Sequence, residues 1–371
     1  MPLPGYLPRP FRVYVLPEWL GNSGGMGIAA WAPLEVGGGK SDNPGMSKIG
    51  GKSKEKKMSE VEKLKKGIKE LQLDMSCSFH CEACEKFFKC KSPEKLKIFE
   101  RRRMSRVLKV MSKIKYKVAI CAGKGGVGKS LFTTNFSTVL ASRGNRVAIL
   151  DQDLDGPCIP RMLGLTKEKM FMGDYGIVPV KGLYDMKVVS LGFVTTEKDI
   201  VNWFQEKRRN ATEEFLSHVD YGELDFLTID LPPGTSSDAV NLMEYIPDLD
   251  GMVVVTNPTR ISQIVARRAT VMAVESGVNM LGIIENMSGF VCPECGEEVD
   301  IMEKGGGKVL AEELEVPYLG HIPLDPRTSE SSDIGIPYVV KYPDSPASRQ
   351  TVAITDRILE NIEKFRQERA R

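Results

Sequence analysis

The sequence has no apolar run as long as the ~18 residues that a membrane-spanning helix needs. It also shows no secretory signal, because its first residues are rich in proline and glycine and do not combine a basic start with an apolar stretch. Net charge is nearly absent, at +2 over 371 residues. These absences argue against membrane and secreted proteins. With 42% hydrophobic and 27% charged residues, the composition is that of a globular protein, and we expect it in the cytoplasm.

Charge is unevenly distributed along the chain. The segment Lys48–Lys117 carries a net +13, which leaves −11 for the rest. A basic arm on an acidic body is typical of an interaction segment or a solvated linker. We therefore do not expect the chain to bind nucleic acid or membranes.

Composition and pattern divide the chain into three parts. Residues 1–57 are rich in Gly, Pro, Ser and Lys, lack periodicity, and are expected to be disordered. Residues 58–114 combine cysteines with basic segments of helical pattern. In residues 115–371, short apolar runs rich in Val and Ile alternate with helix-length segments. The third part therefore has the pattern of an α/β domain.

The apolar runs of this third part are continuous, which predicts strands buried on both faces and hence a mostly parallel sheet flanked by helices. The predicted strands are Lys117–Cys121, Arg146–Asp151, Lys187–Leu191, Phe226–Leu231, Met252–Thr256, Met280–Glu285 and Tyr318–Ile322. The predicted helices include Ser130–Arg143, Ser262–Glu275, Gly307–Leu314 and Ser348–Ala370.

A glycine-rich loop lies between the first predicted strand and the first predicted helix. Its sequence, GKGGVGKS, fits the phosphate-binding pattern G-x-x-x-x-G-K-[ST]. The glycines let successive N–H groups face a phosphate, and the following helix adds its N-terminal dipole. Lys129 is expected to reach the β- and γ-phosphates of ATP, and Ser130 to hold Mg²⁺. The loop residues expected to wrap the phosphates are Gly123, Gly125, Gly126, Val127 and Gly128.

The core of this loop, Lys124–Ser130, resembles the deviant phosphate loop of a family of dimeric ATPases. That family includes the Mrp/Nbp35/ApbC iron–sulfur carriers, the MinD and ParA partitioning proteins and the nitrogenase iron protein. The resemblance implies a homodimer in which Lys124 reaches the partner's nucleotide, as an arginine finger does. It also implies slow, regulatory hydrolysis of ATP to ADP and phosphate.

Two further motifs resemble the switch segments of this family. The run DQDLDGP at Asp151–Pro157 is closest to switch I of the Mrp/Nbp35 branch. It implies that Asp153 activates water and that Asp151 or Asp155 belongs to the Mg²⁺ shell. The run FLTIDLPPGT, which begins at Phe226, resembles Walker B followed by switch II. It implies that Asp230 binds an Mg²⁺-bound water and that the Gly234 N–H senses the γ-phosphate.

Asn286 and Leu131 bear on nucleotide recognition. Asn286 follows an apolar strand and matches the asparagine that reads adenine in the family. Leu131 departs from the pattern, because many relatives have a hydroxyl there that touches the α-phosphate. That contact is not expected in this chain.

Cys292 and Cys295 form a C-x-x-C pair shaped by Pro and Gly. Two thiolates supply half of a tetrahedral or cubane site, so the other half must come from elsewhere in the chain or from a second chain. The resemblance implies that each subunit contributes this pair and that the dimer holds one bridging [4Fe–4S] cluster. Apo iron–sulfur proteins are then the expected recipients, and the cluster donor stays unidentified.

A second group of cysteines comprises Cys77, Cys81, Cys84 and Cys90. The last three match the C-x-x-C-x5-C of the Nbp35 N-terminal extension, which implies a second [4Fe–4S] cluster. Cys77 lies closer to Cys81 than in relatives, and His80 is an alternative to it as a ligand.

Two alternatives to a carrier remain open. Zinc could fill either cysteine site in a zinc-stabilised ATP-dependent adaptor. In that case Cys81 and Cys84 could complete the site of Cys292 and Cys295 within the same chain. A MinD/ParA-type partitioning ATPase shares the nucleotide motifs but has no use for six clustered cysteines. The isolated Cys121 and Cys158 are expected to be buried thiols.

Overall fold

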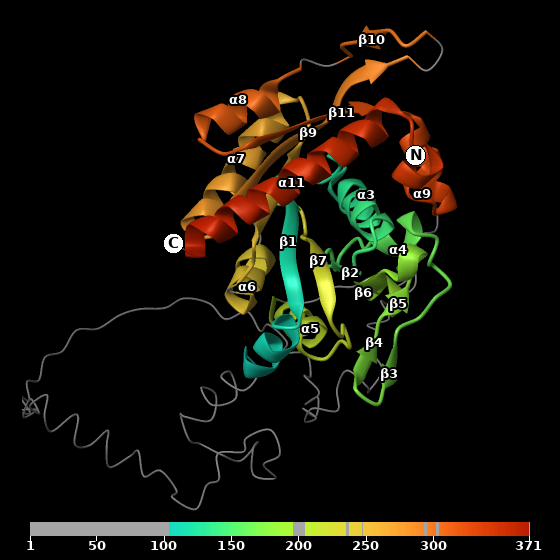
Figure 1. The fold of residues 1–371 in the computed structure, drawn as a ribbon, viewed down its shortest axis with the longest axis vertical. Helices are drawn as coiled ribbons and strands as arrows, with labels where there is room; N and C mark the ends of the chain where they lie inside the picture. Colours follow the sequence, from blue (N-terminus) through green and yellow to red (C-terminus); the bar gives the residue numbers. More distant parts are fainter. Residues whose placement is uncertain are drawn as a thin grey trace, which may run out of the picture. The chain divides into compact units, whose positions relative to one another are not determined.

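A single mixed sheet runs through the part of the chain that the computed structural model describes (Figure 1). The described residues are 104–195, 205–234, 237–246, 248–292, 295–301 and 304–370. The predictions for residues 1–57 and for the first cysteine group lie outside them. A short helical segment, 104–111, precedes the first strand.

Seven strands run parallel, in the order β11-β9-β8-β1-β7-β2-β6. They are β1 (Ile114–Ala122), β2 (Val147–Asp151), β6 (Lys187–Ser190), β7 (Leu224–Asp230), β8 (Gly251–Thr256), β9 (Met280–Val291) and β11 (Tyr318–Leu324). Two short antiparallel strands join them, β5 (Val180–Lys181) beside β6 and β10 (Glu298–Val299) beside β9. A separate hairpin is formed by β3 (Phe171–Gly173) and β4 (Gly176–Val178).

The helices among the described residues are α3 (Lys129–Ser142), α4 (Ile159–Met162), α5 (Gln205–Ser217), α6 (Ser237–Tyr245), α7 (Arg260–Glu275), α8 (Gly306–Glu313), α9 (Arg327–Ile334), α10 (Tyr338–Lys341) and α11 (Pro346–Ala370). None of the helices in these ranges is long and apolar enough to cross a membrane.

Chain direction decides which face of the sheet each helix covers. The step from β1 through α3 to β2 moves across the sheet in one direction, and the step from β8 through α7 to β9 moves in the other. Because crossovers are right-handed, the two helices lie on opposite faces. α11 packs beside α3 and crosses in front of the sheet (Figure 1), whereas α8 packs beside α7. The strands between these layers are covered on both sides, and every residue of β8 is buried.

The direction in which the chain crosses the sheet changes between β1 and β8. The loops at the carboxyl end of β1 therefore face a crevice between helices on opposite faces of the sheet. In open α/β sheets this switch point is where ligands bind. The phosphate loop follows β1 directly.

The structure confirms the fold class and all seven predicted strands. β9 continues past the predicted end at Glu285 to Val291. Its polar residues looked like the end of a strand, yet Glu285 is fully buried and accepts hydrogen bonds from Ser288 Oγ at 2.5 Å and Gly305 N at 3.0 Å. Strands β3, β4, β5 and β10 were not predicted, because two or three residues are too few for a recognisable pattern.

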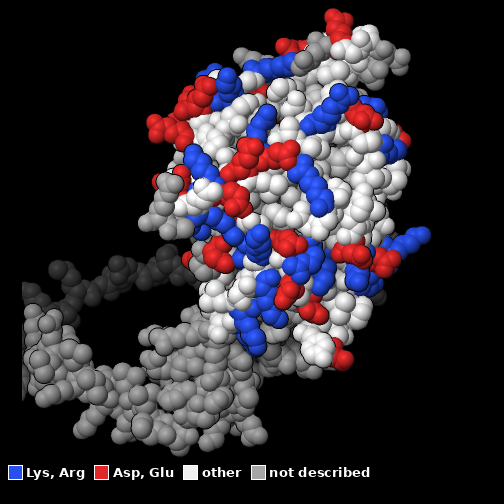
Figure 2. Space-filling view, in the orientation of Figure 1, with Lys and Arg blue, Asp and Glu red and all other residues white. Residues whose placement is uncertain are grey.

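Charged side chains of both signs are interspersed on the face that α11 crosses (Figure 2). That face offers no continuous basic surface of the kind that binds a phosphate backbone.

Candidate functional site

The glycines of the phosphate loop fit their surroundings closely. Gly126 and Gly128 have φ of 79° and 86°, a left-handed conformation that side chains disfavour. A Cβ on Gly123 would lie 2.3 Å from the main-chain carbon of Val265 in α7. The loop is thus curled against α7 and leads into the N-terminus of α3, a geometry that suits phosphate.

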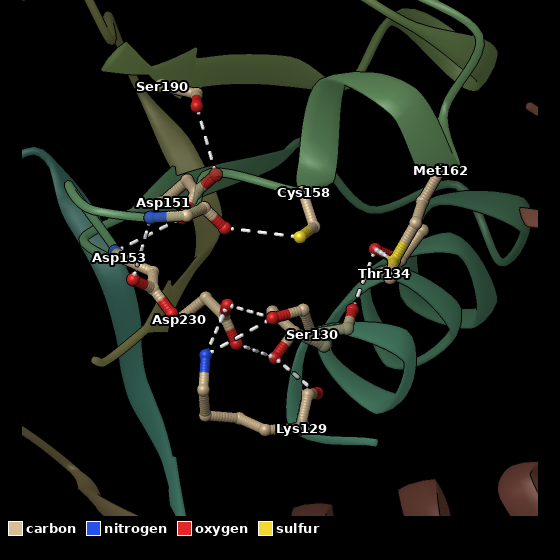
Figure 3. A network of polar contacts seen from close by, with 11 residues as sticks. Lys129, Ser130, Thr134, Asp151, Asp153, Cys158, Met162, Ser190 and Asp230 are labelled. Carbon is tan, nitrogen blue, oxygen red and sulfur yellow. Dashed lines mark hydrogen bonds and ion pairs between the residues drawn. The ribbon is translucent and has the colours of Figure 1, made fainter. Parts of the chain in front are cut away.

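Lys129 and Ser130 of α3 point toward Asp230 at the end of β7 (Figure 3), and Thr133 of the same helix also contacts it. Asp230 Oδ2 lies 2.5 Å from Lys129 Nζ and 2.6 Å from Ser130 Oγ, and its Oδ1 lies 2.6 Å from Thr133 Oγ1. Asp230 is fully buried, and Lys129 is 6% exposed. A hydroxyl and a carboxylate this close offer the hard oxygens that Mg²⁺ prefers, beside the amine expected to reach the phosphates.

Thr133 is a partner of Asp230 that the sequence analysis missed. Its hydroxyl lies one helical turn after Lys129, so both residues are on the same face of α3. That spacing was the available signal.

The three switch aspartates lie in different environments. Asp151 is 1% exposed and accepts a hydrogen bond from Ser190 Oγ at 2.9 Å. Its burial, with a smaller effect of the nearby Asp230 charge, raises the pKa of Asp151 to about 8. Asp153 is half-buried, and burial raises its pKa as well. Asp155 is exposed and paired with Arg208, 2.6 Å away. Of the two candidates for the Mg²⁺ shell, Asp151 is therefore the one beside Asp230.

Asn286 is tied to the phosphate loop. Its Nδ2 donates to the carbonyl of Val127 at 2.9 Å, and the side chain is 6% exposed. An apolar cavity beside it is lined by Leu131, Pro323 and Leu324, among others. Its volume is about 40 Å³, so it marks a small gap beside the phosphate loop and is too small to hold a nucleoside without rearrangement. The carboxyl end of β11, which carries Pro323 and Leu324, was not singled out from the sequence.

Gly234 and Lys124 do not take part in the polar network around Asp230. The Gly234 N–H donates to the carbonyl of Ala122 at 2.8 Å, so contact with a γ-phosphate would require this bond to break. Lys124 is half-exposed and forms no hydrogen bond or ion pair with the other described residues.

Cys292 and Cys295 lie where β9 turns back into β10. The Cys292 carbonyl accepts the Gly296 N–H at 2.8 Å, and the Cys292 N–H donates to Glu297 O at 2.9 Å. Cys292 is half-buried and Cys295 is exposed. Within the described ranges, no group of three or more His, Cys, Asp or Glu side chains could hold a metal ion. Among the described residues, the two cysteines therefore have no third side chain of this kind close enough to complete a metal site.

A cavity of about 490 Å³ adjoins Cys292 and Gly296. Leu324 and Asp325 line both this cavity and the one beside Asn286. The carboxyl end of β11 and the residue that follows it therefore lie between the surroundings of Asn286 and the cysteine pair.

The prediction that Cys121 and Cys158 are buried thiols is right for one of them and wrong for the other. Cys121 is buried, as predicted, and burial raises the pKa of its thiol to about 12. The prediction that Cys158 is buried was wrong. Cys158 is exposed because it lies in the loop before α4, and its thiol contacts Gly156 O at 3.1 Å. The first cysteine group, Cys77 to Cys90, lies outside the described residues.

A family model described as ParA: NUBPL iron-transfer P-loop NTPase matches residues 113–359. The chain belongs to this family. An iron-sulfur cluster carrier protein of Methanocaldococcus jannaschii is 41% identical over 288 residues, which cover 77% of this chain and 98% of that protein. One from Methanococcus maripaludis is 40% identical over 289 residues, covering 78% and 98%.

A solved structure of a nucleotide-binding protein from Archaeoglobus fulgidus, in complex with ADP and with cobalt, is 35% identical. It superposes with a TM-score of 0.56 and covers 62% of this chain and 91% of that chain. Membership of the iron-transfer P-loop NTPase family agrees with the resemblance seen in the motifs. It favours a carrier over a partitioning ATPase.

Proposed function

We propose that this chain is a cytoplasmic ATPase that carries iron–sulfur clusters. Two copies assemble a [4Fe–4S] cluster between them on Cys292 and Cys295 of each, and they pass it to apo iron–sulfur proteins. ATP and Mg²⁺ bind at the phosphate loop and set how firmly the pair of subunits holds its cargo.

The observation that carries this proposal is the course of β9. One continuous strand holds Asn286 against the phosphate loop and, at its end, Cys292. The strand bends between them, where Met287 and Gly289 have φ of 58° and 76°, so at about 3.3 Å per residue the two lie less than about 20 Å apart. A change at the nucleotide site therefore has a short mechanical route to the thiol pair.

The number of cysteine ligands in one hairpin supports a cluster site shared by two chains. Thiolates are the usual ligands of iron–sulfur clusters, and a cubane needs four of them. One hairpin offers two, and no third ligand stands beside them among the described residues. A second copy of the same hairpin supplies the missing pair with the symmetry that a homodimer has.

The proposal assigns a role to each residue of the nucleotide site. Lys129 binds the phosphates, Ser130 binds Mg²⁺, and Asp230 and Asp151 hold Mg²⁺ through water. Asp153 orients the attacking water, and hydrolysis is slow. Lys124 acts on the partner's nucleotide in the dimer, in keeping with its lack of partners among the described residues.

Residues 58–114 are proposed as a separate segment whose cysteines hold a second cluster. Cys81, Cys84 and Cys90 are its ligands, with Cys77 as the fourth. Residues 1–57 are proposed to be a disordered extension.

Anaerobic reconstitution with iron and sulfide tests the proposal. The protein should gain the visible absorption of an iron–sulfur cluster, and it should restore activity to an apo iron–sulfur enzyme. A colourless protein with stoichiometric zinc would overturn it in favour of the zinc adaptor.

A further inference from the structure

Two side chains of α5 contact the loop Asp151–Pro157, here called the switch loop. Thr212 Oγ1 lies 2.8 Å from Gln152 Oε1, and Arg208 Nη1 lies 2.6 Å from Asp155 Oδ1. Arg208 and Thr212 are four residues apart, so they project from the same face of the helix. A single helix face therefore holds the switch loop at two points.

The two contact points lie on either side of Asp153. The bonds of Asp153 itself stay within the loop: its N–H donates to Asp151 Oδ1 and its Oδ1 accepts the Gly156 N–H, each at 3.2 Å. Such bonds shape the loop but do not fix its position relative to the phosphate loop. Contacts from outside the loop do so: the Gln152 N–H donates to Asp230 O at 2.9 Å, Ser190 Oγ donates to Asp151, and α5 adds its two side-chain contacts.

Burial makes the Thr212 contact the firmer of the two. Gln152 and Thr212 are each 2% exposed. Gln152 Nε2 is buried and has no hydrogen-bond partner among the described residues, so losing Thr212 would leave the amide with neither polar atom satisfied. The Arg208–Asp155 pair is easier to break, because the Asp155 side chain is 61% exposed.

The neighbouring face of α5 contacts α6, the helix that follows the predicted switch II. Arg209 Nε donates to Tyr245 Oη at 2.9 Å, and Tyr245 Oη donates to Glu213 Oε2 at 3.2 Å. Arg209 and Glu213 are again one helical turn apart. α5 thus connects the loop after β2 with the helix that follows β7.

We propose that Arg208 and Thr212 are positioning residues for ATP hydrolysis. α5 holds the switch loop so that Asp153 stays aligned with the phosphate loop, and through Tyr245 it couples that alignment to α6. This inference rests on the proposed role of Asp153. Because a misplacement of about 1 Å can cost on the order of a hundredfold in rate, a helix that sets the loop position affects turnover without touching ATP.

The test uses Thr212→Val, which removes the hydroxyl at nearly constant volume, and Arg208→Gln. Each variant should lower kcat about tenfold and leave the Kd for ATP within about twofold of wild type. Amides of the switch loop should exchange hydrogen for deuterium faster in both. Thr212→Ser should restore wild-type behaviour. Arg143→Gln is the matched control, because Arg143 Nη1 also lies 2.6 Å from an aspartate oxygen, in Asp356, away from the switch loop.

Hydrogen exchange decides the outcome independently of turnover. Unchanged exchange in the switch loop of both variants would overturn the proposal, and so would losses of kcat matched by equal losses of ATP affinity. If wild type did not hydrolyse ATP, the proposed function would fail, while the exchange data would still show whether α5 positions the loop. Thermal melts establish that each variant is folded. If Arg208→Gln does not fold, Asp155→Asn removes the same ion pair from its exposed end, and if Thr212→Val does not fold, Thr212→Ala replaces it.

Discussion

The side-chain amide of Asn286 donates a hydrogen bond to the main-chain carbonyl of Val127, 2.9 Å away. The contact joins β9, the strand that ends one residue before Cys292, to the loop expected to hold the phosphates. It is tight, because a Cβ on the adjacent Gly128 would lie 2.1 Å from the same amide nitrogen. The nucleotide site and the cysteine hairpin thus share this strand.

Replacing Asn286 by Ala should weaken the fold and ATP binding together. The Val127 carbonyl loses its donor, which costs about 1–3 kcal/mol of unfolding free energy. The loop also loses the contact that positions it, so the Kd for ATP should rise about tenfold or more. Urea denaturation and calorimetric titration with ATP measure the two effects.

Asn279→Ala is the control for Asn286→Ala. Asn279 Nδ2 likewise donates to a main-chain carbonyl, that of Asp250 at 3.0 Å, but outside the phosphate loop. It should lose stability and keep ATP affinity. Equal loss of ATP affinity in both variants would contradict a specific role for Asn286.

Replacing Lys129 by Ala should abolish ATP binding. The amine is needed at the β- and γ-phosphates, and it also neutralises Asp230, 2.5 Å away and fully buried. Removing one partner of a buried pair costs about 3–5 kcal/mol, so denaturation should show a clear loss of stability too. Unchanged affinity for ATP in a folded variant would refute the assignment of this loop.

Lys124→Ala tests whether this lysine acts on the partner's nucleotide. It should bind ATP but hydrolyse it at least about a hundredfold more slowly, as for a cation supplied in trans. Asp153→Asn should also be inactive. Mixing the two should recover about a quarter of wild-type activity, since half the dimers are mixed and each has one intact composite site. No recovery after subunit exchange would mean that Lys124 acts within its own subunit.

The raised pKa of Asp151 predicts that the stability of the protein depends on pH in Mg²⁺-free buffer. The folded pKa of Asp151 is raised from 3.8 to about 8, chiefly by burial. Between these values the folded state holds a proton that the unfolded chain has lost, so the free energy of unfolding falls as pH rises through this window. Below it both states are protonated, and above it both are ionised. Asp151→Asn should lose this slope and be more stable than wild type above about pH 8; parallel curves from urea denaturation would contradict the prediction.

Cys81→Ala addresses the N-terminal cluster. It should lower the iron bound per chain after reconstitution and leave dimerisation intact, because the bridging site on Cys292 and Cys295 is untouched. Iron analysis and light scattering measure both quantities. Full iron content would show that this segment holds no cluster.

Much of the nucleotide site could be predicted because its chemistry is local in sequence. The glycines, Lys129 and Ser130 are contiguous, and Asp230 ends a run of apolar residues that only a buried strand explains. Contacts between distant segments could not be predicted. Nothing in the helical pattern of Gln205–Ser217 indicates that Thr212 meets Gln152, 60 residues away, or that the Gly234 N–H binds Ala122 O.

The most direct test of the central claim uses a variant in which Cys77, Cys81, Cys84 and Cys90 are all replaced by Ser, so that only the hairpin pair remains of the two cysteine groups. After anaerobic reconstitution, native mass spectrometry should find about four iron atoms per two chains, bound to a dimer, and Cys292→Ala should remove them. A full cluster on single chains, or iron content unaffected by Cys292→Ala, would contradict a cluster shared between two subunits.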